Sequence, residues 1–265
     1  MPSPTERALV LGALHGPAEL LPISSSGHVA LVPWLLRWDS ADDDPELRKT
    51  FEIALHAGTM GALLITLRGE VGEAARDMTP RRAGHVMLSL LPAAIAGVVL
   101  ERPIERRLGT PATIAAGLVG GSLTMAWADR CPQVRAAADA DWRDALWLGA
   151  AQACALVPGV SRNGATLAAA RRRGFAREDA NRLSRHAALP VIAAATTLKV
   201  IRLAGRGVPA GTAVPLAVGV GASFASTLGC TWLIRQVERD RSLLPYAAYR
   251  LALAGAVGWR LLTGG

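Results

Sequence analysis

Apolar runs alternate with short charged runs along the whole chain, and this pattern predicts membrane-spanning helices. Ala83 to Leu100, Pro111 to Ala128 and Val208 to Ile234 contain no Asp, Glu, Lys or Arg. A helix needs about 20 mostly apolar residues to cross the hydrocarbon core of a bilayer. Six spans are therefore predicted, at about residues 50–67, 83–100, 111–128, 187–204, 208–234 and 245–263.

Two further apolar stretches are degenerate copies of each other. Residues 12–27 align without a gap to residues 149–164, at a constant offset of 137 positions that pairs His15 with Gln152, Ser24 with Ser161 and Gly27 with Gly164. In each copy, proline, serine and glycine interrupt the apolar sequence. Interrupted helices at membrane depth occur where protein or a wet cavity covers the exposed backbone. We therefore predict two re-entrant helical hairpins, at about residues 5–38 and 144–170.

The order of spans and hairpins predicts the topology. Three spans separate the hairpins, so the hairpins enter the membrane from opposite faces, with their tips near the midplane. The expected fold is all-α: a polytopic membrane protein with six transmembrane helices and two re-entrant hairpins in an inverted-topology repeat. We expect one membrane domain over residues 1–265, with repeat halves at about 5–128 and 144–263.

The charge balance supports a membrane protein rather than a nucleic-acid-binding protein. The chain has 29 Lys and Arg against 21 Asp and Glu, a formal net charge of +8. The arginines cluster in the connections between apolar runs, as in Arg171–Arg173, and do not form a basic stripe. Under the positive-inside tendency, the connections 68–82, 129–186 and 235–244 lie in the cytoplasm and both termini lie outside. The three cysteines have no metal-binding spacing.

The first repeat copy contains ionisable residues that are costly in a membrane. His15 and Glu19 are four residues apart and share one face of a helix, which Pro17 is expected to kink. An intramembrane ionisable pair indicates a functional site by default; the alternative is a pair in which each residue only satisfies the other. Ser24, Ser25, Ser26 and Gly27 follow, with His28 next. They would present hydroxyls and amides at a helix N-terminus, where the dipole favours anions, or form a simple N-cap and turn.

The second copy strengthens the anion-binding interpretation. It carries Arg162, whose planar guanidinium suits phosphate oxygens, beside Ser161, Asn163 and Thr166. A buried arginine among small residues requires a carboxylate or a phosphate. Elsewhere, Glu52 and His56 are again four apart, and either line the same cavity or pair on their helix. Tyr249-Arg250 within the last span indicates a packing pair or support for the cavity.

Four motifs together resemble a known family, the bacterial undecaprenyl-diphosphate phosphatases, also called bacitracin-resistance proteins. They are Gly16 to His28, Leu55-His-Ala-Gly-Thr59, Pro158-Gly-Val-Ser-Arg162 through Thr166, and Tyr249-Arg250. The resemblance covers nearly the whole chain. It implies a multi-pass enzyme of the bacterial inner membrane that removes the terminal phosphate of undecaprenyl diphosphate, the lipid carrier of peptidoglycan synthesis. It also implies the inverted-repeat fold and a divalent metal, Mg²⁺ or Ca²⁺.

By position in the motifs, the resemblance implies site residues. The catalytic set is Glu19, Ser25, His28 and Arg162; the substrate-binding set is Ser24, Ser26, Gly27, Ser161, Asn163 and Thr166; the metal ligands are His15 and Glu19. Three departures weaken the inferred activity more than the inferred fold. His15 stands where the family has Glu or Gln, Asn163 replaces a serine, and Arg185-His186 replace apolar residues. Loss of a carboxylate weakens a hard-cation site, although imidazole binds other divalent metals or acts in acid–base chemistry.

Two rival functions remain open from the sequence. A polyprenyl-phosphate transporter or flippase would use the same architecture and anion-binding tips without hydrolysis. A divergent phosphatase would act on another lipid diphosphate. In each case the partners are a polyprenyl lipid and the membrane, with no nucleic acid. The sequence leaves open whether the protein is a monomer or a homodimer, and whether Ser25 or water is the nucleophile.

Overall fold

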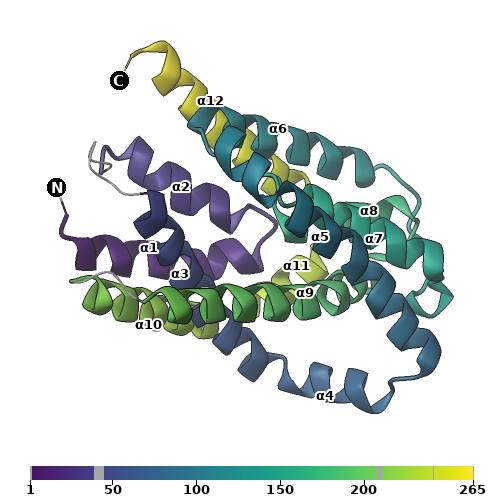
Figure 1. The fold of residues 1–265 in the computed structure, drawn as a ribbon. Helices are drawn as coiled ribbons and strands as arrows, with labels where there is room; N and C mark the ends of the chain where they lie inside the picture. Colours follow the sequence, from purple (N-terminus) through teal and green to yellow (C-terminus); the bar gives the residue numbers. More distant parts are fainter. Residues whose placement is uncertain (1, 39–44, 208–210, 241, 265) are drawn as a thin grey trace. The chain divides into compact units, whose positions relative to one another are not determined.

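The computed structural model describes residues 2–38, 45–207, 211–240 and 242–264, and within these the fold is entirely helical (Figure 1). Beyond the helices, the described residues contain one isolated β-bridge, between Arg135 and Phe175, and no strand. The predicted all-α class is confirmed. The helices are α1 (Pro4–Leu20), α2 (Ser25–Leu35), α3 (Pro45–Thr66), α4 (Arg68–Arg76), α5 (Pro80–Arg107), α6 (Pro111–Ala128), the 3₁₀ helix η1 (Ala137–Asp139), α7 (Trp142–Cys154), α8 (Arg162–Arg172), α9 (Arg177–Arg206), α10 (Ala213–Gly229), α11 (Trp232–Arg239) and α12 (Leu244–Leu262).

Two described helices are long and apolar enough to cross a membrane: Pro80–Leu100 within α5 and Arg177–Gly205 within α9. Two bent pairs would each add a span, Leu47–Thr66 with α4 and α10 with α11. The apolar helices therefore fit a membrane protein. The total of six spans stays a prediction.

The predicted spans differ from the observed helices mainly at their ends. The predicted span 111–128 has the bounds of α6, whereas α5 and α9 continue into the flanking charged residues. Those residues, largely Arg and Glu, are good helix formers, so loss of apolarity does not end the helix. The predicted span 208–234 starts with three residues outside the described part and breaks after Gly229, with a bend of 50° before α11. Gly229, Cys230 and Thr231 are all weak helix formers.

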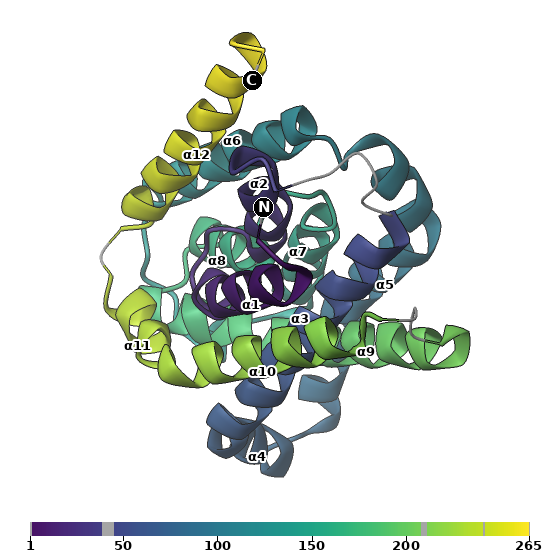
Figure 2. The same ribbon diagram turned by 90° about the vertical axis from the view of Figure 1, so that its left-hand side faces the viewer.

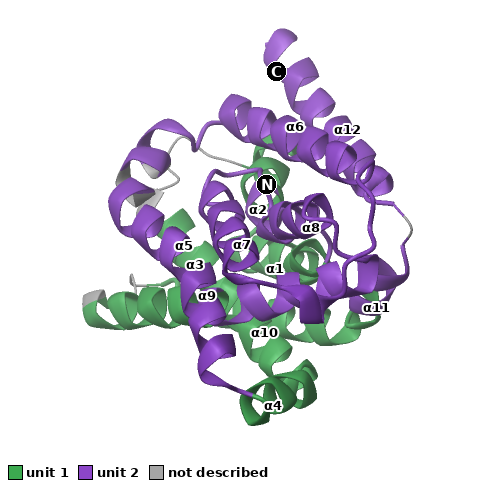
Figure 3. Ribbon diagram, turned by 90° about the vertical axis from the view of Figure 1, so that its right-hand side faces the viewer, with its two compact units in different colours: residues 1–20, 28–77, 192–233 green, residues 21–27, 78–191, 234–265 purple. Residues whose placement is uncertain are grey.

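The chain forms two compact units, and each unit draws on both predicted repeat halves (Figure 3). Unit 1 comprises residues 1–20, 28–77 and 192–233. Unit 2 comprises residues 21–27, 78–191 and 234–265. Helices from opposite halves of the sequence therefore pack together within one unit, as α1 does with α10 and α5 does with α7.

Unit 1 is built on close contacts of α10 with α1 and α3, and glycines allow them (Figure 2). A Cβ on Gly16 would lie 2.6 Å from the Thr227 amide nitrogen, and one on Gly58 would lie 2.3 Å from the Val220 carbonyl oxygen. The Ser226 hydroxyl donates to the Gly12 carbonyl at 3.0 Å. Small residues that let helix backbones approach are typical of helix packing in lipid.

Unit 2 places α8 against α6 and α7, with α12 along α6. Small and apolar side chains of α8 contribute to two core clusters. One cluster contains Met125, Ala128, Leu167, Ala168, Val237 and Leu243, and the other contains Leu148, Ala169, Ala170, Phe175, Ala180 and Ala187. The second break, residues 155–161, therefore leads directly into α8, a helix that packs against its neighbours on several sides.

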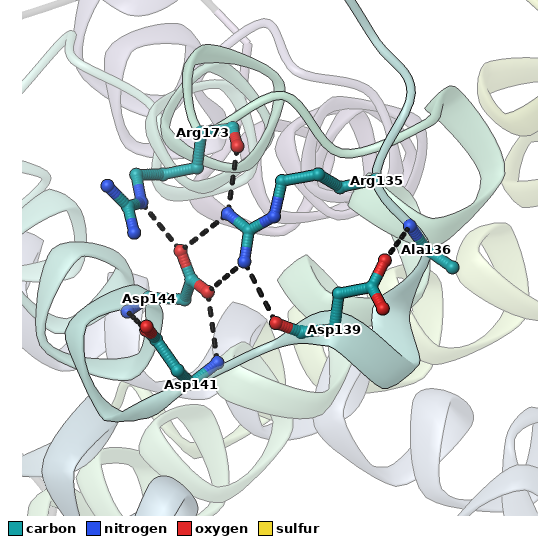
Figure 4. A network of polar contacts seen from close by, with 6 residues as sticks. All are labelled: Arg135, Ala136, Asp139, Asp141, Asp144 and Arg173. Atoms are coloured by element: carbon teal, nitrogen blue, oxygen red, sulfur yellow. Dashed lines mark hydrogen bonds and ion pairs between the residues drawn. The ribbon is translucent and has the colours of Figure 1, made fainter.

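A polar clasp centred on Asp144 joins the start of α7 to the end of α8 (Figure 4). Arg135 donates to both carboxylate oxygens of Asp144, at 3.1 and 2.7 Å, and to the Arg173 carbonyl at 2.9 Å. The Arg173 Nε–H donates to Asp144 at 2.6 Å. Burial raises the pKa of Asp144, but hydrogen bonds from Arg135, the Asp141 amide and Arg173 outweigh it and hold this pKa at about 2. The clasp closes the base of the hairpin formed by α7 and α8.

A second ion pair fixes the end of α8 to neighbouring helices. The fully buried Arg171 donates to Asp129, which follows the last residue of α6. The other oxygen of Asp129 accepts from the Ser242 hydroxyl and the Leu243 amide, both at 2.5 Å, just before α12. Asp129 therefore ties three helices of unit 2 together.

Candidate functional site

The two breaks predicted from the repeat have matching backbone geometry. Ser24 precedes α2 with φ 77°, and Ser161 precedes α8 with φ 67°; apart from these, Arg37 is the only described non-glycine residue with positive φ. Each serine Oγ accepts a hydrogen bond from the glycine amide three residues on, Gly27 at 3.3 Å and Gly164 at 3.2 Å. A non-glycine residue with positive φ costs on the order of 1–3 kcal/mol. Both breaks therefore hold a strained serine that caps a helix.

The tips of the two breaks lie against each other within unit 2. A Cβ on Gly27 would lie 3.7 Å from the Gly159 Cα, and a Cβ on Gly164 would lie 3.4 Å from the Pro22 carbonyl oxygen. These contacts are equivalents in the repeat, because both pairs, Gly27 with Gly164 and Pro22 with Gly159, are 137 residues apart. The structure therefore brings the two predicted tips together in a pseudo-symmetric arrangement.

Arg250 of α12 binds both tips. Its side chain is fully buried and donates to the carbonyls of Pro22 at 3.3 Å, and of Gly159 and Val160 at 2.9 Å each. It also reaches the Leu118 carbonyl on α6. The carbonyls of Pro22, Gly159 and Val160 belong to breaks between helices, where the helix ladder supplies no partner. Of the two interpretations of Tyr249-Arg250, support for the site is the one that the geometry favours, since Tyr249 is 46% exposed and Arg250 points inward.

Most of the predicted anion-binding residues lie around these tips in unit 2. Ser24, Ser25 and Ser161 are buried, while Ser26, Arg162 and Asn163 are partly exposed. Ser25 and Ser26 start α2, and Arg162 and Asn163 start α8, so two helix N-termini with their amide donors converge here. Helix N-termini favour negative charge.

Thr166 is the most enclosed residue of the predicted set. It is fully buried, and its hydroxyl contacts the carbonyls of Arg162 and Asn163 and the Ser184 hydroxyl, the last at 2.5 Å. Its predicted role in substrate binding stays a prediction. The structure shows that it joins α8 to α9.

The other predicted residues belong to unit 1. His28 is buried on α2 directly after Gly27, and Glu19 lies at the end of α1. His28 is three residues from Ser25 on α2, so the two share a helix face. Leu20 and Leu21, like Gly27 and His28, are chain neighbours across the boundary of the units. The roles of Glu19 and His28 stay predictions from the motifs.

A second polar cluster lies within unit 1. The ligand atoms of His15, Glu19 and His56 all lie within 4.8 Å of one another. The rings of His15 and His56 meet edge to face, with centroids 4.6 Å apart. His56 Nε2 is 3.8 Å from Glu52 on the same helix. His56 therefore pairs with Glu52 on its own helix and also contacts His15. That Glu52 and His56 line the cavity of the site stays a prediction.

Thr59 and Thr227 support His15, and neither was predicted as a site residue. His15 Nδ1 lies 2.8 Å from Thr59 Oγ1, which lies 3.2 Å from Thr227 Oγ1. The signal for Thr59 was present in its motif, since it follows His56 by three residues and so shares its helix face. Thr227 has no such signal, because its position depends on α10 packing against α1 and α3.

Comparison with known proteins identifies the family. The bacitracin resistance protein BacA family matches residues 8–256. The undecaprenyl-diphosphatase of Geobacter metallireducens is 41% identical over 262 residues, covering 94% of this chain and 95% of that protein. The undecaprenyl-diphosphatase of Geobacter sulfurreducens is 42% identical over 264 residues, with 94% and 96% covered. Undecaprenyl-diphosphatase 2 of Stutzerimonas stutzeri is 35% identical over 271 residues, with 97% of each chain covered.

These matches confirm the family resemblance that the four motifs indicated. They extend from α1 to α12 and include both breaks and the Arg250 contacts. The chain therefore belongs to the BacA family.

Proposed function

We propose that this protein is an integral membrane phosphatase that hydrolyses undecaprenyl diphosphate to undecaprenyl phosphate and inorganic phosphate. The names of the relatives at 35–42% identity support the substrate. The observation that carries the proposal is the convergence of two serine-capped helix N-termini at the tips joined by Arg250. Two such N-termini, with Arg162 at the start of one, suit a ligand with two phosphate groups.

The chain's own groups supply what phosphoryl transfer needs most, which is positioning and charge stabilisation. First-turn amides of α2 and α8 and the Arg162 guanidinium bind the phosphate oxygens. Ser25, or a water molecule, attacks the terminal phosphorus. The bond from that phosphorus to the bridging oxygen breaks, and undecaprenyl phosphate leaves. If Ser25 attacks, water then hydrolyses the phosphoserine.

Proton transfer is assigned to residues near Ser25 in the sequence. His28 shares the face of α2 with Ser25 and takes the proton of the attacking hydroxyl or water. Glu19 balances charge or receives a proton. The lipid tail lies in the bilayer, where α5 exposes apolar side chains such as Leu91, Ile95 and Val98. The proposed location is the bacterial inner membrane, with six spans and two re-entrant hairpins.

The test is phosphate release from undecaprenyl diphosphate by the purified protein in detergent. Arg162→Ala should abolish release while leaving the protein folded. Arg172→Ala is the matched control, because Arg172 is exposed at the other end of α8, over the Trp127 ring. Near-normal release by Arg162→Ala would refute the proposed site. Transfer of labelled polyprenyl phosphate across vesicles without any phosphate release would instead establish the transporter.

The metal that the family resemblance implies, Mg²⁺ or Ca²⁺, does not fit the ligands present. Both ions prefer oxygen ligands, whereas two of the three grouped donors, His15 and His56, are imidazole nitrogens. Glu19 is the one carboxylate of the group. No step of the proposed reaction is therefore assigned to a magnesium or calcium ion at this cluster.

A further inference from the structure

The cluster of His15, Glu19 and His56 has the donor composition of a transition-metal site. It combines two imidazoles and one carboxylate from two packed helices, α1 and α3. Imidazole suits zinc, copper, iron and nickel, whereas sites for magnesium, calcium and manganese are built from carboxylates, carbonyls and water. Two histidines and a glutamate are also a ligand set of zinc enzymes, which leave a fourth position open.

Hydroxyl groups of α3 and α10 support His15. His15 Nδ1 lies 2.8 Å from the Thr59 hydroxyl oxygen. The Thr227 hydroxyl lies 2.6 Å from the Ser223 carbonyl and 3.2 Å from the Thr59 hydroxyl, which accepts from it. These contacts hold the buried imidazole ring of His15 in place.

Contacts of this kind are typical of metal-binding histidines. A histidine ligand usually makes a hydrogen bond through its other ring nitrogen to a carboxylate, a backbone carbonyl or water, which fixes the orientation of the ring. The Thr59 hydroxyl contacts one ring nitrogen of His15, and the Glu52 carboxylate lies 3.8 Å from His56 Nε2. His15 is fully buried, so the Thr59 contact also orients a ring that water does not reach.

The distances fit a small ion after modest side-chain movement. Zinc binds nitrogen and oxygen at about 2.0–2.2 Å, so neighbouring donors in a tetrahedral site lie roughly 3.4 Å apart. The three donors here lie within 4.8 Å of one another. His15 and Glu19 are spaced i, i+4 on α1, so both donors lie on the same face of that helix.

We propose that His15, Glu19 and His56 form a binding site for Zn²⁺, selective against Mg²⁺ and Ca²⁺. The substitution of histidine at position 15 and the placement of His56 beside it together change the metal class from the hard cations that the family resemblance implies. This inference does not rest on the proposed phosphatase activity, because it concerns binding of the metal without substrate.

The test is metal binding by the full-length protein, purified in detergent and stripped with a chelator. Zn²⁺ is titrated in competition with a chromophoric chelator, and Co²⁺ is added separately as a spectroscopic probe. We expect one Zn²⁺ per chain, retained against at least a hundredfold excess of Mg²⁺ or Ca²⁺. Co²⁺ should give the visible absorption of a low-coordinate site with nitrogen ligands. Wild-type protein that is folded and binds no Zn²⁺, or loses it to Mg²⁺ at equal concentration, would overturn the proposal.

Variants localise the site. His15→Ala and His56→Ala should each weaken Zn²⁺ binding more than tenfold. Thr59→Val should weaken it by about tenfold, because it removes the hydroxyl that contacts His15 Nδ1. His15→Glu should shift the preference toward Mg²⁺. His85→Ala is the matched control, because His85 lies on α5 in unit 2, outside the cluster. Equal Zn²⁺ affinity in all of these variants would place the ion elsewhere and refute the assignment. Should an alanine variant fail to fold, His56→Gln and the wild-type Co²⁺ spectrum still decide the question.

Discussion

Ser24 and Ser161 stand 137 residues apart and adopt the same strained backbone, with φ 77° and φ 67°. Each caps the next helix through the glycine amide three residues on. The two copies of the weak sequence repeat therefore have the same backbone conformation and the same helix cap at this serine. The serines stay at positive φ, where glycine would be cheaper, because their hydroxyls satisfy amides that the helix start leaves exposed.

The strain at these caps predicts an unusual order of stability. Ser161→Ala loses the cap and keeps the positive φ, whereas Ser161→Gly loses the cap and relieves the strain. Loss of a cap to Ala costs about 1 kcal/mol and to Gly a few tenths, and relief of strain adds about 1 kcal/mol to the difference. Thermal unfolding in detergent should therefore rank the glycine variant above the alanine variant by about 1–2 kcal/mol, and the same should hold at Ser24.

Thr110 is the matched control for the cap prediction. It caps α6 at an ordinary φ of −79°, where glycine has no strain to relieve. The difference between Thr110→Gly and Thr110→Ala should be smaller than at Ser161 by about 1 kcal/mol. Equal differences at the two positions would show that the positive φ of Ser161 stores no strain.

Arg250→Lys should disorder both tips. A single ammonium cannot reach the carbonyls of Pro22, Gly159 and Val160 that the guanidinium binds together. Breaking such a buried polar network costs on the order of 3 kcal/mol, which lowers the melting temperature by roughly 6–12 °C at about 2–4 °C per kcal/mol. Phosphate release should fall with it. Tyr249→Phe, at the exposed neighbouring position, should change neither, and a normal melting temperature for Arg250→Lys would contradict this role.

Two glycines predict opposite effects of the same substitution. Gly58→Ala places a Cβ 2.3 Å from the Val220 carbonyl, so α3 and α10 must separate, at a cost of about 1–3 kcal/mol. Gly72→Ala on α4 meets no atom within 4 Å and replaces a poor helix former, so it should stabilise the protein by about 0.5–1 kcal/mol. Thermal unfolding of both variants under one condition checks the contrast. A Gly58→Ala variant as stable as the wild type would show that α10 does not pack tightly on α3.

The Asp144 clasp predicts a loss of stability in acid. The pKa of this carboxyl is about 2 in the folded protein against its ordinary 3.8, so its contribution is complete above pH 3.8 and is lost as the pH falls toward 2. Melting temperatures measured across this window should fall for the wild type. Asp144→Asn should start lower at neutral pH and change less across the window. Parallel curves for the two proteins would exclude Asp144 as the titrating group.

The sequence by itself determined the helical class, the bounds of α6, the position of both breaks and the family. These properties follow from local features of the sequence. The features are the runs of apolar residues, the proline, serine and glycine residues at each helix break, and the constant offset between the two repeat copies. Helix ends were less predictable, because Arg and Glu continue a helix as readily as apolar residues do. The length of α9 was missed for this reason. The break after Gly229 was missed because the weak helix formers Gly229, Cys230 and Thr231 lie inside a run without charged residues.

The tertiary structure decided which distant residues meet. Packing of α10 against α1 and α3 brings Thr227 to Thr59, which in turn contacts His15. Likewise, only the fold shows that Arg250 binds two tips more than 90 residues distant from it in the chain. Neither set of contacts can be predicted from the spacing of residues along the chain. Each depends on helices that approach closely because glycine and serine are small. Pairing between elements is a property of packed surfaces, which the order of residues along one helix does not specify.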